Sequence, residues 1–139
     1  MTSGALRARE TAAIALVGRT VPVEVDERLG DIEFGVFAGG SLEAYREWIA
    51  SHAPDEAPPG GESRAATLLR FASAYRSLLA RAEAHVLVVA HGLTLTALAD
   101  ERPQPVVAGA PYGTWLRLTR DELAAAVARI ERWCEAPAW

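Results

Sequence analysis

A histidine at the end of a short apolar run is the first residue in this sequence that could do chemistry. The run extends from Val86 to Ala90, contains no polar residue, and is followed by His91 and Gly92. Such a run is typical of a strand that is buried on both faces of a parallel sheet. A polar side chain between this strand and a following helix lies where open α/β sheets bind ligands, beside helix N–H groups that favour an anion. His91 is therefore a candidate ligand-binding residue, and the alternative is a hydrogen-bonded histidine with a structural role only.

Three further residues could act with His91 on a phosphoryl group. Arg7 lies near the start of an expected helix, and Asp31 and Glu33 lie in a loop that is interrupted by glycines. A guanidinium matches phosphate oxygens, a histidine can donate to a phosphoryl oxygen, and a carboxylic acid can protonate a leaving alkoxide. These groups predict a phosphoryl-transfer site that needs neither a metal nor a cofactor. The alternative for both carboxylates is that they are solvated turn residues.

The composition limits the classes of function that are open to the chain. It has 139 residues, of which half are hydrophobic, and a formal net charge of -4. This length predicts a single domain over residues 1–139. The acidic balance argues against nucleic acid as a partner and leaves no polybasic patch for a membrane surface. No apolar run approaches the ~20 residues of a membrane span.

Residue usage also points to a cellular setting. Because the only cysteine is Cys134, no internal disulfide can form, and a reducing cytoplasm is the expected location. We expect Cys134 to fill space in the core. Arginine supplies every basic residue and lysine is absent, which is typical of a GC-rich bacterial genome.

Helical spacing and capping residues predict five helices that position these groups. They are expected over residues 4–17, 42–49, 62–83, 93–99 and 121–133. Ser3 and Ser41 are expected to cap the first two, and Thr119 with Glu122 has the spacing of a capping box.

Apolar or alternating runs predict three strands, over residues 21–25, 86–90 and 114–118. Proline- and glycine-rich loops are expected over residues 51–61 and 102–113. The mixture of strands and helices predicts an α/β fold with three layers, in which helices cover both faces of a mostly parallel sheet.

Four segments stand in an order that is typical of one family. Residues 3–12 are similar to the motif S-x-L-x-R-A-x-x-T-A, with Ala5 in place of the usual leucine, and residues 29–39 are similar to L-x-E-x-x-F-G-x-W-E-G. Residues 59–63 match P-G-G-E-S, and residues 88–92 match a strand that ends in His-Gly. Together they resemble the histidine phosphatase superfamily, in its phosphoglycerate-mutase-like branch, over nearly the whole chain.

The resemblance implies a phosphohistidine mechanism and a role for each candidate residue. Arg7 resembles the arginine that grips the phosphoryl group, and His91, followed by Gly92, resembles the second histidine that stabilises it. Asp31 stands at the position of the proton donor, where glutamate is more usual, so Glu33 stays an alternative for that role. The implied partner is a small phosphorylated substrate or inorganic phosphate.

The chain departs from the family in one respect. The family's R-H-G motif, whose histidine is the nucleophile, is missing, and neither His52 nor His85 has its sequence context. We expect an N-terminally truncated member that lacks the nucleophile strand. Three explanations stay open: a fragment or misplaced start, direct pairing of residues 21–25 with residues 86–90, or a second chain that fills the gap. The last of these predicts a homodimer through an exposed sheet edge.

The sequence therefore leaves several functions open. The first is a phosphomonoester hydrolase that is inactive as the chain stands, and the second is a phosphotransferase of the mutase type. The short lid-like segment over residues 51–59 favours the hydrolase. The others are an inactive phosphate-binding module and a self-associating remnant.

Overall fold

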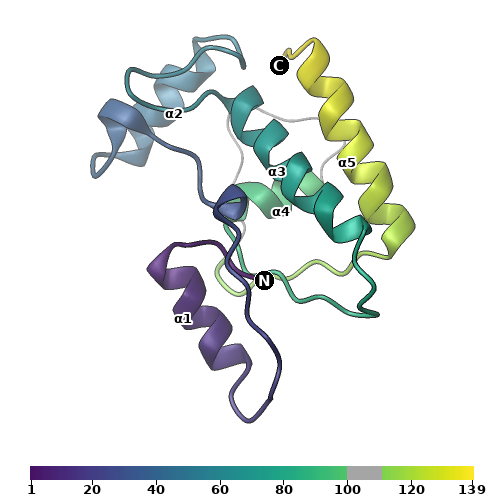
Figure 1. Ribbon diagram of the computed structural model, residues 1–139. Coiled ribbons are helices and arrows are strands. Elements are labelled where there is room, and N and C mark those ends of the chain that lie inside the picture. Colours follow the sequence, from purple (N-terminus) through teal and green to yellow (C-terminus); the bar gives the residue numbers. More distant parts are fainter. Residues whose placement is uncertain (100–110) are drawn as a thin grey trace.

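The computed structural model describes residues 1–99 and 111–139, and Figure 1 shows the arrangement of its helices. Each of the five expected helices is present, with ends that differ from the prediction by a few residues. In chain order the elements are α1 (Leu6–Ala15), the 3-10 turns η1 (Glu27–Leu29) and η2 (Gly35–Phe37), α2 (Leu42–Ala50), α3 (Arg64–Leu79), α4 (Gly92–Ala99) and α5 (Arg120–Glu135). No helix in these ranges is both long enough and apolar enough to cross a membrane.

The helix caps follow the prediction at two of three sites. The Ser41 hydroxyl accepts a hydrogen bond from the amide of Glu43 at 3.1 Å, and Thr119 and Glu122 form the predicted capping box. The prediction for Ser3 is wrong, because Ala5 is the N-cap residue of α1. The main chain of Ser3 is paired with Val89, so the helix begins further along the chain.

The three predicted strands are not formed as strands in the part of the chain that the structure describes. Two isolated parallel bridges join Thr2 to Val25 and Thr2 to Val89. A strand needs a run of paired residues on a neighbour, and the short N-terminal segment Met1–Ser3 provides only single bridges. Because Met1–Ser3 lies between the two segments, the direct pairing of residues 21–25 with residues 86–90 is wrong. The third segment, residues 114–118, has no bridge to another described residue.

The helices lie on two sides of these extended segments. Helices α3 and α5 lie side by side, with α4 next to them, and α1 lies on the other side of the N-terminal residues (Figure 1). The main core is formed between α3, α4 and α5, where Phe71, Leu68 and Val127 are fully buried. Cys134 packs against this core as predicted, and burial raises the pKa of its thiol to about 11.

The loop that follows η1 is anchored in two places. Leu29 is fully buried in the main core. Three residues later, Ile32 is buried in a second cluster with Tyr45 and Ile49 of α2. Asp31 is therefore held between two apolar anchors. Of the predicted connection over residues 102–113, only the last three residues lie within the described part of the chain.

Candidate active site

Three candidate residues that are distant in the sequence lie together at one point in the structure. Arg7 is the second residue of α1, Asp31 follows η1, and His91 directly precedes α4. Arg7 Nη2 donates to Asp31 Oδ2 at 2.8 Å and to His91 Nδ1 at 3.0 Å. Asp31 Oδ2 lies 3.4 Å from the same ring nitrogen. The three side chains thus form one cluster, which we call the Arg7–Asp31–His91 cluster.

The hydrogen bonds of His91 define its protonation state. A guanidinium can only donate, so Nδ1 accepts from Arg7 and the ring proton is on Nε2. The Ser3 hydroxyl oxygen lies 2.9 Å from Nε2 and accepts a hydrogen bond from its N–H group. Burial lowers the pKa of His91, and this effect and the Arg7 cation outweigh the opposite effect of the Asp31 carboxylate. The ring is therefore neutral near pH 7.

The cluster combines a buried member with an exposed one. The His91 side chain is 4% exposed, whereas the Arg7 side chain is 66% exposed. An ion pair with such an exposed partner is worth at most about 1 kcal/mol, so an anion from solution can compete with Asp31 for Arg7. Gly92 begins α4 next to His91, and the N–H groups and dipole at a helix N-terminus favour an anion.

Arg70 holds the Asp31 loop against α3. Its guanidinium donates to the carbonyl oxygens of Arg28, Gly30 and Asp31 at 2.8, 2.9 and 3.2 Å. It also makes a two-point pair with Glu62, at 3.0 and 2.6 Å. Burial alone would raise the pKa of Glu62, but the bonds from Arg70 and other donors outweigh it and the pKa is lowered. Asp31 is thus fixed through its own main chain.

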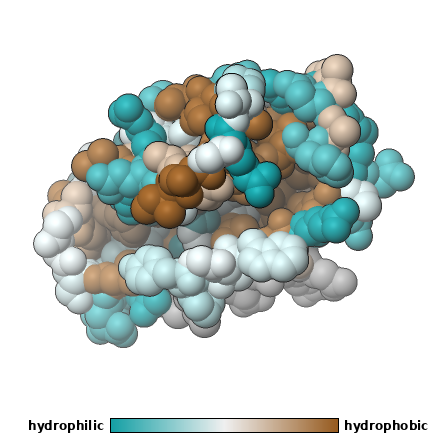
Figure 2. Space-filling view, turned by 90° about the horizontal axis from the view of Figure 1, so that it is seen from below, coloured by the Kyte–Doolittle hydropathy of each residue, from teal (hydrophilic) through white to brown (hydrophobic). Residues whose placement is uncertain are grey.

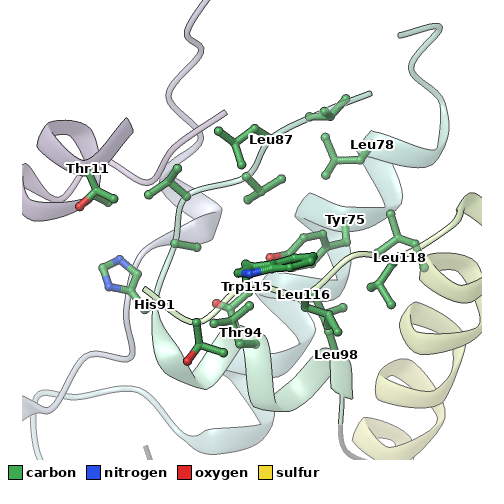
Figure 3. Close-up of a pocket in the computed structure, with 18 of the residues that line it drawn as sticks. Thr11, Tyr75, Leu78, Leu87, His91, Thr94, Leu98, Trp115, Leu116 and Leu118 are labelled. Carbon is green, nitrogen blue, oxygen red and sulfur yellow. The ribbon is translucent and has the colours of Figure 1, made fainter. Parts of the chain in front are cut away.

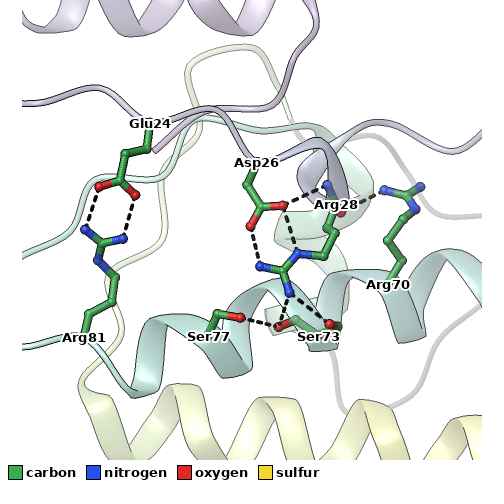
Figure 4. A network of polar contacts seen from close by, with 7 residues as sticks. All are labelled: Glu24, Asp26, Arg28, Arg70, Ser73, Ser77 and Arg81. Atoms are coloured by element: carbon green, nitrogen blue, oxygen red, sulfur yellow. Dashed lines mark hydrogen bonds and ion pairs between the residues drawn. The ribbon is translucent and has the colours of Figure 1, made fainter.

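A second set of contacts fixes the start of this loop. Arg28 donates to both carboxylate oxygens of Asp26 and to the carbonyl and hydroxyl of Ser73 on α3 (Figure 4). Arg81, two residues after the end of α3, donates two hydrogen bonds to the carboxylate of Glu24. Charged side chains therefore hold residues 24–28, which lead into the site, against α3 and against Arg81, which follows α3.

Two glycines allow the Asp31 loop to meet the P-G-G-E-S segment. The amide of Val36 donates to the Pro59 carbonyl at 3.0 Å, and the amide of Glu62 donates to the Glu33 carbonyl at 2.9 Å. A Cβ at Gly35, where φ is +55°, would lie 2.3 Å from the Pro59 carbonyl oxygen. One at Gly61 would lie 2.6 Å from the Glu33 carbonyl oxygen. Side chains at these positions would force the two segments apart.

The remaining candidates lie outside the cluster. The Glu33 side chain is exposed and shares no hydrogen bond or ion pair with the other described residues. His52 stacks on Trp48 with ring centroids 4.1 Å apart, and His85 is exposed. Neither is bonded to the cluster. Within the described ranges, no three His, Cys, Asp or Glu residues gather into a set that could hold a metal ion.

The prediction missed the roles of Ser3 and Arg70. Ser3 stands first in the S-x-L-x-R motif, and this position was the one signal for its contact with His91. Arg70 lies on the polar side of a predicted helix, and nothing in the spacing of residues indicates that it reaches three carbonyls about 40 positions earlier in the chain.

The chain is similar to known proteins in sequence and in fold. The profile of the histidine phosphatase superfamily (branch 1) matches residues 1–105. The chain belongs to the histidine phosphatase superfamily. It is also similar to the solved structure of Bacillus stearothermophilus YhfR, with 34% sequence identity and a TM-score of 0.58. The match covers 70% of this chain and 55% of YhfR, so this member of the superfamily spans about half the length of that neighbour. A search of curated proteins gave no match.

Proposed function

We propose that the Arg7–Asp31–His91 cluster is the phosphate-binding part of a phosphomonoester hydrolase that uses a phosphohistidine intermediate. The observation that carries the proposal is the convergence of the three side chains on one point, with Arg7 Nη2 bonded to both partners. Family membership supports phosphatase or mutase chemistry in general. The short segment over residues 51–59 favours a hydrolase over a mutase, because it leaves little chain to enclose a second substrate group.

The roles of the residues follow from their positions. Arg7 binds two phosphate oxygens. Once the anion has displaced Arg7 from Nδ1 of His91, that nitrogen takes up a proton and donates a hydrogen bond to a third oxygen. The N–H groups at Gly92 and the start of α4 face the same charge. Asp31 first takes up the proton of the bound phosphate ester monoanion. A histidine nitrogen then attacks phosphorus, the bond from phosphorus to the ester oxygen breaks, and Asp31 gives that proton to the leaving alkoxide. Water then hydrolyses the phosphohistidine.

The nucleophile of this reaction is not supplied by the histidines in these 139 residues. His91 has the second-histidine role, and His52 and His85 are not bonded to the cluster. This arrangement favours a second candidate function, a phosphate-binding module without catalysis. We expect the 139-residue chain to bind inorganic phosphate or vanadate and to leave an aryl phosphate unhydrolysed. If the pure chain hydrolyses the aryl phosphate and His91→Ala abolishes this activity, the proposal that the chain lacks its nucleophile is wrong.

The binding proposal is tested by the melting temperature of the chain with and without millimolar phosphate. We expect phosphate to raise the melting temperature, because a ligand that binds only the folded state stabilises it. Arg7→Ala removes the effect. Arg9→Ala, which removes an exposed arginine two residues away, is the matched control and keeps it. If the wild type shows no rise, or Arg9→Ala loses as much as Arg7→Ala, the site is not the one described.

Asp31→Asn separates binding from proton donation. In the free chain the Asp31 carboxylate occupies Arg7, and it repels a phosphate that approaches the same guanidinium. Its removal should strengthen phosphate binding several-fold, which corresponds to about 1 kcal/mol, the repulsion between two unit charges in water. Weaker binding in Asp31→Asn would mean that the carboxylate helps to hold the anion.

A further inference from the structure

Arg64 is a buried arginine for which the described part of the chain provides no carboxylate of its own. It is the first residue of α3 and is 8% exposed. Two carboxylates of the same region are already paired, Asp31 with Arg7 and Glu62 with Arg70. The Nε atom of Arg64 is fully enclosed and has no hydrogen-bond partner. Arginine is rarely buried without a partner, because the removal of a cation from water is costly. The contacts within the described chain therefore do not explain why Arg64 is buried.

The start of α3 places the Arg64 guanidinium near Tyr45 and Asp31. Ser63 fixes this end of the helix, because its hydroxyl accepts a hydrogen bond from the amide of Ala66 at 3.1 Å. Burial lowers the pKa of Arg64, and the Tyr45 phenol and the Asp31 carboxylate act in the opposite direction. Both groups must lie close to the guanidinium to have this effect. An arginine side chain nevertheless stays charged in a protein, so a cation is held beside the candidate proton donor.

Tyr45 offers a second donor at the same place. It is 4% exposed, and its ring packs edge-on against Phe34 with ring centroids 4.7 Å apart. Ile32, the residue after Asp31, belongs to the same apolar cluster as Tyr45. Burial raises the pKa of Tyr45, so the hydroxyl keeps its proton at neutral pH and can donate it to an anion. Arg64 and Tyr45 thus hold two hydrogen-bond donors beside the loop that carries Asp31.

These donors lie apart from the cavity that borders the Arg7–Asp31–His91 cluster. The cavity has a volume of about 860 Å³, and neither Arg64 nor Tyr45 lines it. Figure 3 shows His91 at one edge of the cavity and mainly apolar side chains around it, with residues 115–118 on the opposite wall. Figure 2 shows the hollow from outside, with hydrophobic residues gathered around it. Arg64 and Tyr45 therefore lie on another side of Asp31.

We infer, on the basis of the proposed function, that Arg64 and Tyr45 form a second anion-binding subsite, which takes a carboxylate or a phosphate on the alcohol part of the phosphate ester. In the proposed function Asp31 protonates the leaving oxygen, so the alcohol part of the ester lies beside Asp31. Arg64 and Tyr45 flank the same loop from α3 and α2. A guanidinium and a phenol hydroxyl both donate to anionic oxygens. The second anion of the substrate supplies the negative charge that Arg64 lacks.

The probes are phosphate esters that differ only in the second anion. Phosphoglycolate and its longer homologues carry a carboxylate, and the bisphosphates of the matching alkanediols carry a second phosphate. Alkyl phosphates of the same chain lengths carry no second anion and are the matched controls. In calorimetric titrations of the wild type, we expect the best ester with a second anion to bind about tenfold more tightly than the alkyl phosphate of its length. The carboxylate and bisphosphate series show which of the two anions fits.

Three variants place this preference at Arg64 and Tyr45. Arg64→Met removes the charge but keeps most of the side-chain length, so it should bind all three series alike and bind inorganic phosphate as the wild type does. Tyr45→Phe keeps the buried ring and should lose a smaller part of the preference. Arg46→Met is the matched control, because Arg46 lies on α2 and pairs only loosely with Glu43, at 4.0 Å, and it should keep the full preference.

The melting temperature without ligand separates a binding role of Arg64 from a structural one. Arg64→Met should melt at or above the temperature of the wild type, because it removes a buried cation that has no partner. A marked fall would show that the cation has a partner within the chain, and this overturns the subsite. A wild type that binds inorganic phosphate but prefers neither series with a second anion overturns the subsite alone, as does an equal loss of preference in Arg64→Met and Arg46→Met. A wild type that binds no inorganic phosphate overturns the proposed function, and the subsite with it.

Discussion

The Asp31 loop and the segment Trp115–Leu118 border the same cavity, but they are held in different ways. Carbonyl oxygens of the loop accept hydrogen bonds from Arg70, and its side chains at Leu29 and Ile32 are buried. The main chain of Trp115–Leu118 has no such partner among the described residues, and its tryptophan is largely exposed. Buried main-chain groups are almost always paired in folded proteins. The Asp31 loop is therefore a region that this chain holds by its own hydrogen bonds, whereas the main chain of Trp115–Leu118 is open to solvent.

The groups that hold the Asp31 loop also affect phosphate binding. The groups that position Asp31 come from α3 and from the P-G-G-E-S segment, and both are present in this chain. Phosphate binding can therefore be intact while the opposite wall of the cavity is open. Three substitutions test the stability of the region around the Asp31 loop, which this chain holds by its own hydrogen bonds.

The largest effect is expected at the contact between the two glycine segments. Gly35→Ala places a Cβ 2.3 Å from the Pro59 carbonyl oxygen and keeps a φ of +55°, so the loops must separate. We expect the free energy of unfolding to fall by roughly 3 kcal/mol or more in urea titration. Gly39→Ala is the matched control, because Gly39 has a φ of +75° and nothing within 4 Å. It should lose about 1 kcal/mol, and equal losses in the two variants would show that the close approach is unimportant.

The next effect concerns the clamp on the Asp31 loop. Arg70→Met leaves three carbonyls and the Glu62 carboxylate without their donor, and we expect a loss of about 2–4 kcal/mol in stability together with weaker phosphate binding. Arg76→Met is the control on the same helix, because Arg76 also pairs with a glutamate, Glu131, but its side chain is 61% exposed. Its loss should stay below about 1 kcal/mol. If both variants bind phosphate like the wild type, Arg70 stabilises the loop without positioning Asp31.

The smallest effect is the pH dependence that His91 contributes. Burial lowers the pKa of His91 in the folded chain, so the unfolded chain binds a proton first as the pH falls. The unfolded state then holds more protons, and stability is lost as the pH drops below about 6.5. His91→Gln should lose less stability than the wild type between pH 7.5 and pH 5.5, by on the order of 1 kcal/mol. The same slope in both proteins would show that the ring is not held in its neutral form.

The sequence predicted the helices well because the information for them is local. The apolar spacing of α3 and the caps at Ser41 and Thr119 lie within a few residues of the helices that they define. The strands were predicted wrongly because pairing is decided by segments far apart in the chain. Residues 86–90 have the composition of a buried strand, but among the described residues they pair only with Met1–Ser3.

The sequence predicted only those residues of the candidate site whose positions the family's motifs mark. The positions of Arg7, Asp31 and His91 in the family's motifs were enough to expect that they act together. The Ser3 hydroxyl was assigned to a helix cap because spacing alone cannot reveal a contact with His91 across 88 positions. Arg70 reaches the Asp31 loop through carbonyl oxygens, which every residue has and no sequence pattern marks.

The most direct test of the phosphate site is a titration of the His91 ring by ¹⁵N NMR with and without inorganic phosphate. In the free chain we expect the ring to be neutral near pH 7, with the proton on Nε2. Bound phosphate should raise the pKa of His91, because the anion stabilises the imidazolium, and the signals of His52 and His85 should not change. A His91 signal that titrates identically with and without phosphate would contradict the account.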